Sequence, residues 1–150
     1  MIKRLICATV LGALPFSVMA ESHATDTDAG ETEMAAEAVT FELTGDAKKG
    51  ERVFKKCKAC HAVGEGAENK VGPALNGILG RTIAADEDFG YSDVLTAMGA
   101  EGTTWTPEEL AAFLTKPREY AKGTKMTFAG LRKEKDRDNV IAFLGLQVEE

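Results

Sequence analysis

Cysteine and histidine are scarce in this chain, yet three of these residues stand close together. Of three cysteines and two histidines in 150 residues, Cys57, Cys60 and His61 share the single stretch CKACH. Two cysteines separated by two residues occur in zinc sites, in redox-active disulfides and at sites of covalent haem attachment. The remainder of the sequence must therefore decide among three kinds of chemistry.

The first twenty residues predict export from the cytoplasm. Lys3 and Arg4 precede an uncharged run, residues 5–20, that ends in the small-residue pattern Val-Met-Ala typical of a cleaved signal peptide. A retained membrane anchor is the alternative, but sixteen helical residues span only about 24 Å of a hydrocarbon core of about 30 Å. We therefore predict that residues 1–20 are removed, Cys7 with them, and that the protein is periplasmic.

Two of the three chemistries fit the exported chain poorly. A structural zinc site needs four ligands, and beyond CKACH the exported chain offers only His23. A thioredoxin-like pair is expected in a βαβ setting, whereas strand patterns are nearly absent. In haem attachment each residue has one task, because the two thiols bond to the vinyl groups of the porphyrin and His61 binds the iron. We predict one covalently bound haem c.

The charge distribution predicts a tail followed by one domain. Residues 21–44 contain seven acidic and no basic side chains, without a sustained apolar period, which is typical of a solvated tail or linker. Residues 45–150 contain 16 basic and 17 acidic side chains and are predicted to form a single haem domain. Nucleic acid is excluded as a partner, because the exported chain is acidic and has no basic stripe with stacking aromatics.

A helix is predicted to lead into the cysteine motif. Gly50, Val53, Phe54 and Cys57 follow the i, i+3, i+4, i+7 spacing of one buried helical face. A glycine inside a helix costs about 1 kcal/mol relative to alanine. We therefore expect another helix to approach closely at Gly50.

Two further helices are predicted near the C-terminus. Thr106 caps the first, with Pro107 at its first position and Glu109 in the capping box, and Lys116-Pro117 ends it. Its apolar stripe is Leu110, Phe113 and Leu114. The second helix is expected over residues 133–146, with Val140, Ile141, Phe143 and Leu144 facing inward.

A methionine could bind the iron opposite His61. Met34 lies in the acidic tail, and Met98 precedes Gly99 at the end of a helical pattern, where packing is the expected role. Met126 lies in the polar, glycine-bounded stretch KGTKMTFAG, where a lone methionine has little reason to be core. Met126 is therefore the favoured candidate, and a permanent sixth ligand indicates an electron carrier.

From residue 45 to about residue 147 the chain resembles the class I c-type cytochromes, the mitochondrial-type electron carriers and their bacterial periplasmic relatives. Six stretches occur in the order and at the approximate spacing of that family: GERVFKKCKACH, KVGPALNGILGR, FGYSD, TWTPEELAAFLTKP, GTKMTFAG and DRDNVIAFL. The resemblance implies a small all-α class I cytochrome c fold. In that fold the N- and C-terminal helices cross, with Phe143 over Gly50, and further short helices and loops wrap around one haem.

The resemblance also implies roles for individual residues. Met126 is the axial ligand opposite His61, and the carbonyl of Pro73 accepts the free ring N–H of His61; an ordinary Gly-Pro turn is the alternative for Pro73. The remaining haem contacts implied are Arg81, Tyr91 and Trp105 at the propionates, with Thr124 and Phe128 beside Met126.

Three residues depart from the mitochondrial pattern. Phe113 stands where those proteins carry a tyrosine that reaches the methionine sulfur, and Leu95 replaces an asparagine of a buried polar network. Lys122 replaces the proline before GTKM. We expect a drier haem pocket, one donor fewer at Met126 and a less rigid loop.

The resemblance predicts a soluble electron carrier and not an enzyme. It is expected to act as a monomer that takes electrons from a quinol:cytochrome c oxidoreductase and docks transiently on a cytochrome c oxidase or a photosynthetic reaction centre. Two alternatives are a membrane-tethered carrier that keeps residues 1–20, and a haem peroxidase or gas sensor if Met126 leaves the iron. The predicted docking surface is a set of lysines that could also be an ordinary solvated face: Lys55, Lys56, Lys58, Lys116, Lys122 and Lys125.

Overall fold

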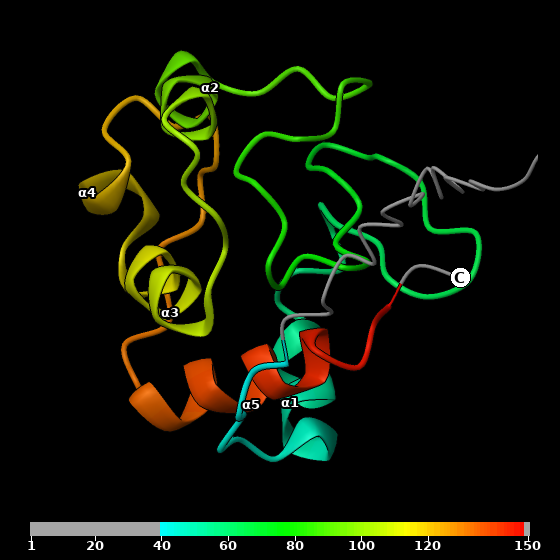
Figure 1. Cartoon of the computed structure of the whole chain (residues 1–150). Coiled ribbons are helices and arrows are strands. Elements are labelled where there is room, and N and C mark those ends of the chain that lie inside the picture. Colours follow the sequence, from blue (N-terminus) through cyan, green and yellow to red (C-terminus); the bar gives the residue numbers. More distant parts are fainter. Residues whose placement is uncertain (1–39, 149–150) are drawn as a thin grey trace, which may run out of the picture. The chain divides into compact units, whose positions relative to one another are not determined.

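Residues 40–148 are described by the computed structural model, and within them the fold is helical. Its helices are α1 (Ala47–Phe54), α2 (Asp93–Ala100), α3 (Pro107–Thr115), α4 (Pro117–Tyr120) and α5 (Glu134–Leu144) (Figure 1). The strand pairing in this range is one isolated antiparallel bridge between Thr82 and Thr104. The all-α prediction is confirmed. Each helix in residues 40–148 is too short or too polar to span a bilayer, and the predicted signal peptide lies outside the described residues.

The first and last helices pack against each other, as predicted (Figure 1). Gly50 is buried in α1 at the contact, and a Cβ atom there would overlap the backbone carbonyl of Asn139 in α5 and the Cβ of Phe143. The backbone N–H of Asp46 donates to the side-chain oxygen of Asn139 at 2.8 Å. The rings of Phe54 and Phe143 lie 5.3 Å apart. The close approach that Gly50 required is therefore made by α5.

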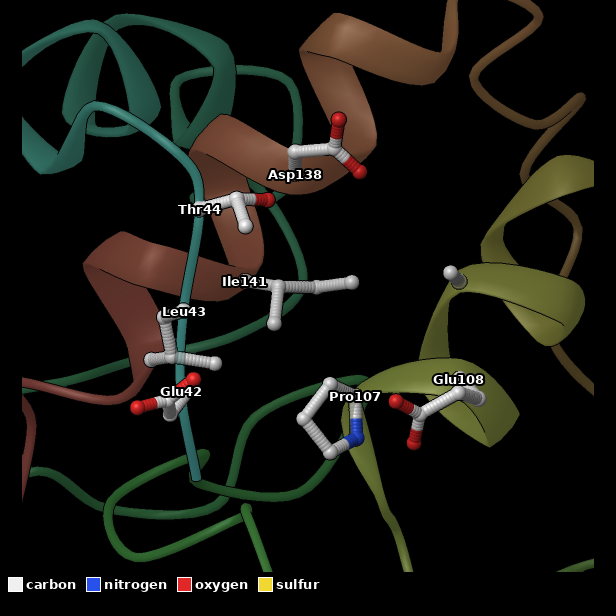
Figure 2. Close-up of a pocket in the computed structure, with 8 residues that line it drawn as sticks. Glu42, Leu43, Thr44, Pro107, Glu108, Asp138 and Ile141 are labelled. Atoms are coloured by element: carbon white, nitrogen blue, oxygen red, sulfur yellow. The ribbon is translucent and has the colours of Figure 1, made fainter. Parts of the chain in front are cut away.

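The acidic tail was predicted over residues 21–44, but its last residues pack on the folded domain. Residues 21–39 lie outside the described residues, but Leu43 packs against the hydrophobic core and lies beside Gly145, and the ring of Phe41 faces Gly80. In Figure 2 the chain from Glu42 to Thr44 passes along α5, opposite the first turn of α3. A groove of about 230 Å³ separates these elements. Because Phe41 and Leu43 bury apolar surface, residues 41–44 belong with the folded domain despite the acidic composition before them.

The predicted capping of α3 is confirmed, and the terminal helix is shorter than predicted. The backbone N–H of Glu109 donates to the side-chain oxygen of Thr106 at 3.2 Å, and α3 ends at Thr115 before Pro117 opens the separate helix α4. The terminal helix was expected over residues 133–146 but begins after its N-cap Lys133 and ends at Leu144, one residue before Gly145. Glycine at this position is a poor helix former, which accounts for the earlier end.

Helices α3 and α4 complete the core around one tryptophan. Trp105 is buried and its ring lies 5.0 Å from that of Phe113, which in turn lies 5.7 Å from Tyr120. The hydroxyl of Tyr120 donates to the carboxylate of Glu109. Burial and this bond to a carboxylate raise the pKa of Tyr120 to about 12, so the phenol stays protonated and α3 stays joined to α4 at ordinary pH.

Candidate haem-binding site

The CKACH stretch forms a hydrogen-bonded turn directly after α1. The backbone N–H groups of Cys60 and His61 both donate to the carbonyl of Cys57, at 3.0 Å and 2.9 Å. In helical turns, residues at i, i+3 and i+4 lie on one side, so Cys57, Cys60 and His61 face the same direction. Neither cysteine forms a disulfide within residues 40–148, and burial raises the pKa of the Cys57 thiol to about 11. The turn thus presents two protonatable thiols and one imidazole together.

The imidazole of His61 is fixed in one orientation. Its Nδ1 lies 2.7 Å from the carbonyl oxygen of Pro73, which can only accept, so Nδ1 carries the proton and Nε2 keeps its lone pair. A Cβ on Gly72 would lie 2.8 Å from both ring nitrogens, so the ring packs directly on the glycine backbone. Burial lowers the pKa of His61, against the opposing effect of the Pro73 bond. The neutral ring is the form that binds metals.

Backbone and amide hydrogen bonds hold Pro73 at this distance. The N–H of Gly72 donates to the carbonyl of Cys60 at 2.8 Å, which ties the proline loop to the cysteine turn. The side chain of Asn76 both accepts from the N–H of Gly64, at 2.8 Å, and donates to its carbonyl, at 2.9 Å. This pair of hydrogen bonds closes the loop over residues 64–76. The closed loop holds Pro73 in place against His61.

The three residues implied for the haem propionates lie near one another. The N–H of Trp105 donates to the carbonyl of Arg81 at 2.9 Å, next to the Thr82–Thr104 bridge. Burial raises the pKa of Tyr91, and the nearby charge of Arg81 opposes that rise. The Arg81 guanidinium also donates to the carbonyls of Ala74 and Asn76, at 3.1 Å and 3.2 Å. The Arg81 cation therefore lies on the proline loop with the Tyr91 phenol near it, and the backbone of Trp105 is bonded to the same arginine.

Ser92 is a candidate that the sequence reasoning missed. It precedes α2, directly after Tyr91, and its hydroxyl is buried without a hydrogen-bond partner in the described part of the chain. A buried unpaired hydroxyl is costly, and a carboxylate group of a haem would supply an acceptor there. Together with the thiol pair and the oriented imidazole, the donors present fit a covalently attached haem. The only sequence signal for Ser92 as a site residue is its position directly after Tyr91 in the stretch FGYSD.

Met126 lies in the irregular segment between α4 and α5. Its side chain is half-buried and packs against the hydrophobic core, as do the side chains of Phe128 and Met98. The N–H of Met126 donates to the hydroxyl of Thr124 at 3.3 Å. Met98 sits in α2, where packing was expected, and Met34 lies outside the described residues. Met126 is thus the methionine of residues 40–148 that lies in a loop rather than a helix.

The six predicted docking lysines are exposed but differ in their contacts. Lys56 lies 4.0 Å from the carboxylate of Asp136, and Lys116 lies 2.8 Å from that of Glu119. The ammonium group of Lys125 donates to the carbonyls of Gly90, at 2.9 Å, and Tyr91, at 2.8 Å, and its role in docking stays a prediction. Of the six, Lys55, Lys58 and Lys122 have no such partner within residues 40–148.

Comparison with known proteins identifies the family. The sequence profile named Cytochrome c matches residues 47–146. Cytochrome c2 of Agrobacterium tumefaciens is 54% identical over 100 residues, which cover 67% of this chain and 90% of that protein. Cytochrome c-550 of Ancylobacter novellus is 55% identical over 96 residues, 64% of this chain and 90% of that protein. The structure of cytochrome c2 from Rhodospirillum centenum superposes with a TM-score of 0.65 at 42% identity, covering 70% of this chain and all of that one. This chain belongs to the cytochrome c family, whose cofactor is one covalently bound haem c.

Proposed function

We propose that this protein is a soluble periplasmic one-electron carrier whose haem iron is held between His61 and Met126. Cytochromes c are electron carriers rather than enzymes, and bound haem c supplies an iron that gains and loses one electron. The observation that carries the proposal is the 2.7 Å contact between His61 Nδ1 and the Pro73 carbonyl. This hydrogen bond leaves Nε2 without a proton and fixes the orientation of the ring, as an axial ligand requires.

Each group of residues then has a distinct task. Cys57 and Cys60 hold the porphyrin through thioether bonds, so the cofactor is retained through repeated oxidation and reduction. Arg81, Tyr91, Trp105 and Ser92 would donate to the propionates, which need donors where they are partly buried. Met126, whose backbone N–H donates to Thr124, would supply a second ligand to the iron, and Phe128 would add apolar cover near it. With both axial positions taken, no substrate site remains at the metal, which favours electron transfer over catalysis.

Docking is proposed to use the exposed lysines around the cysteine turn and the methionine loop. Lys55 and Lys58 flank Cys57, and Lys122 begins the loop that carries Met126. A partner with acidic groups around its own redox centre fits this surface. We propose a quinol:cytochrome c oxidoreductase as the donor, and a cytochrome c oxidase or a photosynthetic reaction centre as the acceptor. The protein would meet each of them as a monomer in brief encounters.

Electron transfer to an acidic partner should slow steeply as salt is added. Steering by opposite charges is screened by salt, so the second-order rate constant is expected to fall roughly tenfold or more between low and high ionic strength. Lys58→Gln should flatten this dependence. The matched variant Lys48→Gln, at the opposite end of α1, should keep it. Stopped-flow kinetics measure both, and a rate independent of salt would contradict electrostatic docking.

The periplasmic location has its own test. Signal cleavage after Ala20 predicts a mature protein that begins at Glu21, without Lys3, Arg4 and the apolar run that follows them. N-terminal sequencing of the haem-loaded protein, taken from a periplasmic fraction, should read ESHAT. A protein recovered with membranes and still beginning at residue 1 would instead establish the tethered carrier, with residues 21–40 as its connection to the domain.

A further inference from the structure

A groove lies between the segment that leads into α1, the first turns of α3 and one side of α5 (Figure 2). Its volume is about 230 Å³. Pockets for drug-sized ligands measure about 300–1,000 Å³, so this groove is too small for such a molecule and suits one or two side chains. None of the residues that line it belongs to the proposed haem-binding site.

Close contacts hold both sides of the groove in place. A Cβ atom on Gly45 would overlap the backbone carbonyl of Asp138 in α5. Farther along the same helix, a Cβ atom on Gly145 would overlap the side chain of Leu43. On the opposite side, Pro107 stands at the first position of α3, where its ring fixes φ. The groove is therefore part of the folded domain and does not have to form when a partner binds.

Apolar side chains form the inner part of the groove, and carboxylates form its edge. Ile141 is 4% exposed, and its side chain points into the gap between the segment before α1 and α3 (Figure 2). Glu42, Glu108 and Asp138 lie around this gap, one from each of the three elements. None of the three has an ion-pair partner in the described part of the chain. The groove therefore combines an apolar floor with a negative edge.

The groove and α1 lie on different sides of α5. Successive residues of an α-helix turn by about 100°. Asn139 and Phe143, which contact Gly50 of α1, therefore lie nearly opposite Asp138 and Ile141, which line the groove. The cysteine turn and its exposed lysines follow directly after α1. A partner bound in the groove would thus leave these lysines free for a second partner.

We propose that this groove is a second docking surface, and that its occupant is a segment of a partner protein in which basic side chains flank an aliphatic one. The aliphatic side chain would cover Ile141, and the basic side chains would pair with the carboxylates at the edge. The chain's own tail is a poor occupant, because residues 21–39 contain six acidic and no basic side chains. The proposal does not depend on which residues bind the haem iron.

Titration of the haem-loaded protein with the peptide acetyl-Lys-Leu-Lys-amide, followed by NMR in the reduced state, tests this surface. The backbone amide signals that shift should be those of residues 42–44, 108–111 and 138–141, and they should saturate together. The peptide acetyl-Lys-Ser-Lys-amide has the same charge without the aliphatic side chain. It should bind roughly fivefold more weakly, because less apolar surface is buried.

A change of shape without a change of charge gives the first pair of variants. Ala111 lines the groove and is half-buried, so Ala111→Gln should fill the groove and lower the affinity for acetyl-Lys-Leu-Lys-amide about tenfold. Ala112→Gln places the same side chain on the exposed neighbour and should leave the affinity unchanged. Circular dichroism of both variants shows that they are folded. Equal affinities of the two variants would overturn the groove as the binding site.

Two double variants separate local charge from net charge. Glu42→Gln with Glu108→Gln should weaken peptide binding about fivefold, the combined effect of two exposed ion pairs. Glu87→Gln with Glu101→Gln removes the same charge from exposed positions outside the groove and should leave the affinity close to that of the wild type. Equal losses in both, or signal shifts scattered over the surface, would overturn a specific site. A wild-type dimer that Ala111→Gln abolishes would assign the groove to a second copy and overturn the proposed partner.

Discussion

Replacing Met126 by alanine is expected to abolish the weak near-infrared band of the iron–sulfur bond and to open the iron to external ligands. The thioether is the only group proposed for the sixth position, and as an internal ligand it competes at a high effective concentration. Its removal should raise the affinity of the oxidised protein for imidazole roughly a hundredfold or more. The reduction potential should fall, since methionine ligation raises it. Absorption spectroscopy and a redox titration measure these changes.

Met98→Ala is the matched control for this substitution. Met98 is also partly buried against the core, but it lies in α2. Its truncation should cost about 1–3 kcal/mol of the free energy of unfolding and leave the band unchanged. The reverse pattern, with the band lost in Met98→Ala and kept in Met126→Ala, would assign the ligand to α2.

The wild-type protein in the same experiment separates the carrier from the other functional class. A closed iron binds carbon monoxide slowly in the reduced state, whereas Met126→Ala should bind it rapidly. If the wild type binds carbon monoxide as fast as the variant, Met126 leaves the iron readily. The proposal of a simple electron carrier would then give way to a gas sensor or a peroxidase, since an accessible iron is what those functions require.

Much of the site could be predicted because its signals are local in sequence. Cys57, Cys60 and His61 fall within one turn, so their spacing alone places them on one side. Thr106, Pro107 and Glu109 likewise determine the start of α3 through contacts within four residues. The cofactor and one helix could therefore be derived from short stretches of sequence before any tertiary contact was known.

The remaining features depend on partners that are distant in the chain. Lys125 resembles the other exposed lysines in sequence, and only the fold shows that its partners are Gly90 and Tyr91. Asn139, whose side chain accepts from Asp46 across 93 positions, has no signal in the helical pattern of α5. Phe41 and Leu43 were hidden by acidic neighbours. In each case the local sequence gives only the type of residue and its neighbours, whereas its role depends on a contact with a distant part of the chain.

The contact between α1 and α5 predicts the largest loss of stability from a single substitution. Gly50→Val places a Cβ atom where the Asn139 carbonyl group lies, and backbone atoms of a helix cannot rotate away as a flexible side chain can. In an exposed helix, replacing glycine by alanine would raise the free energy of unfolding by up to about 1 kcal/mol. Here the overlap reverses the sign, and we expect a loss of about 3 kcal/mol or more in the free energy of unfolding.

Glu51→Val separates this overlap from the helix propensity of valine. Glu51 is the next residue of α1 and is exposed, so the same side chain meets solvent there and should cost about 0.5 kcal/mol. Thermal unfolding of the haem-loaded proteins, followed by circular dichroism, measures both variants, and the midpoint temperature of Gly50→Val should fall by roughly 15 °C. Equal stabilities of the two variants would contradict a close helix crossing. A selective loss in Gly50→Val, with the near-infrared band intact below the transition, would show that this crossing stabilises the domain without forming part of the metal site.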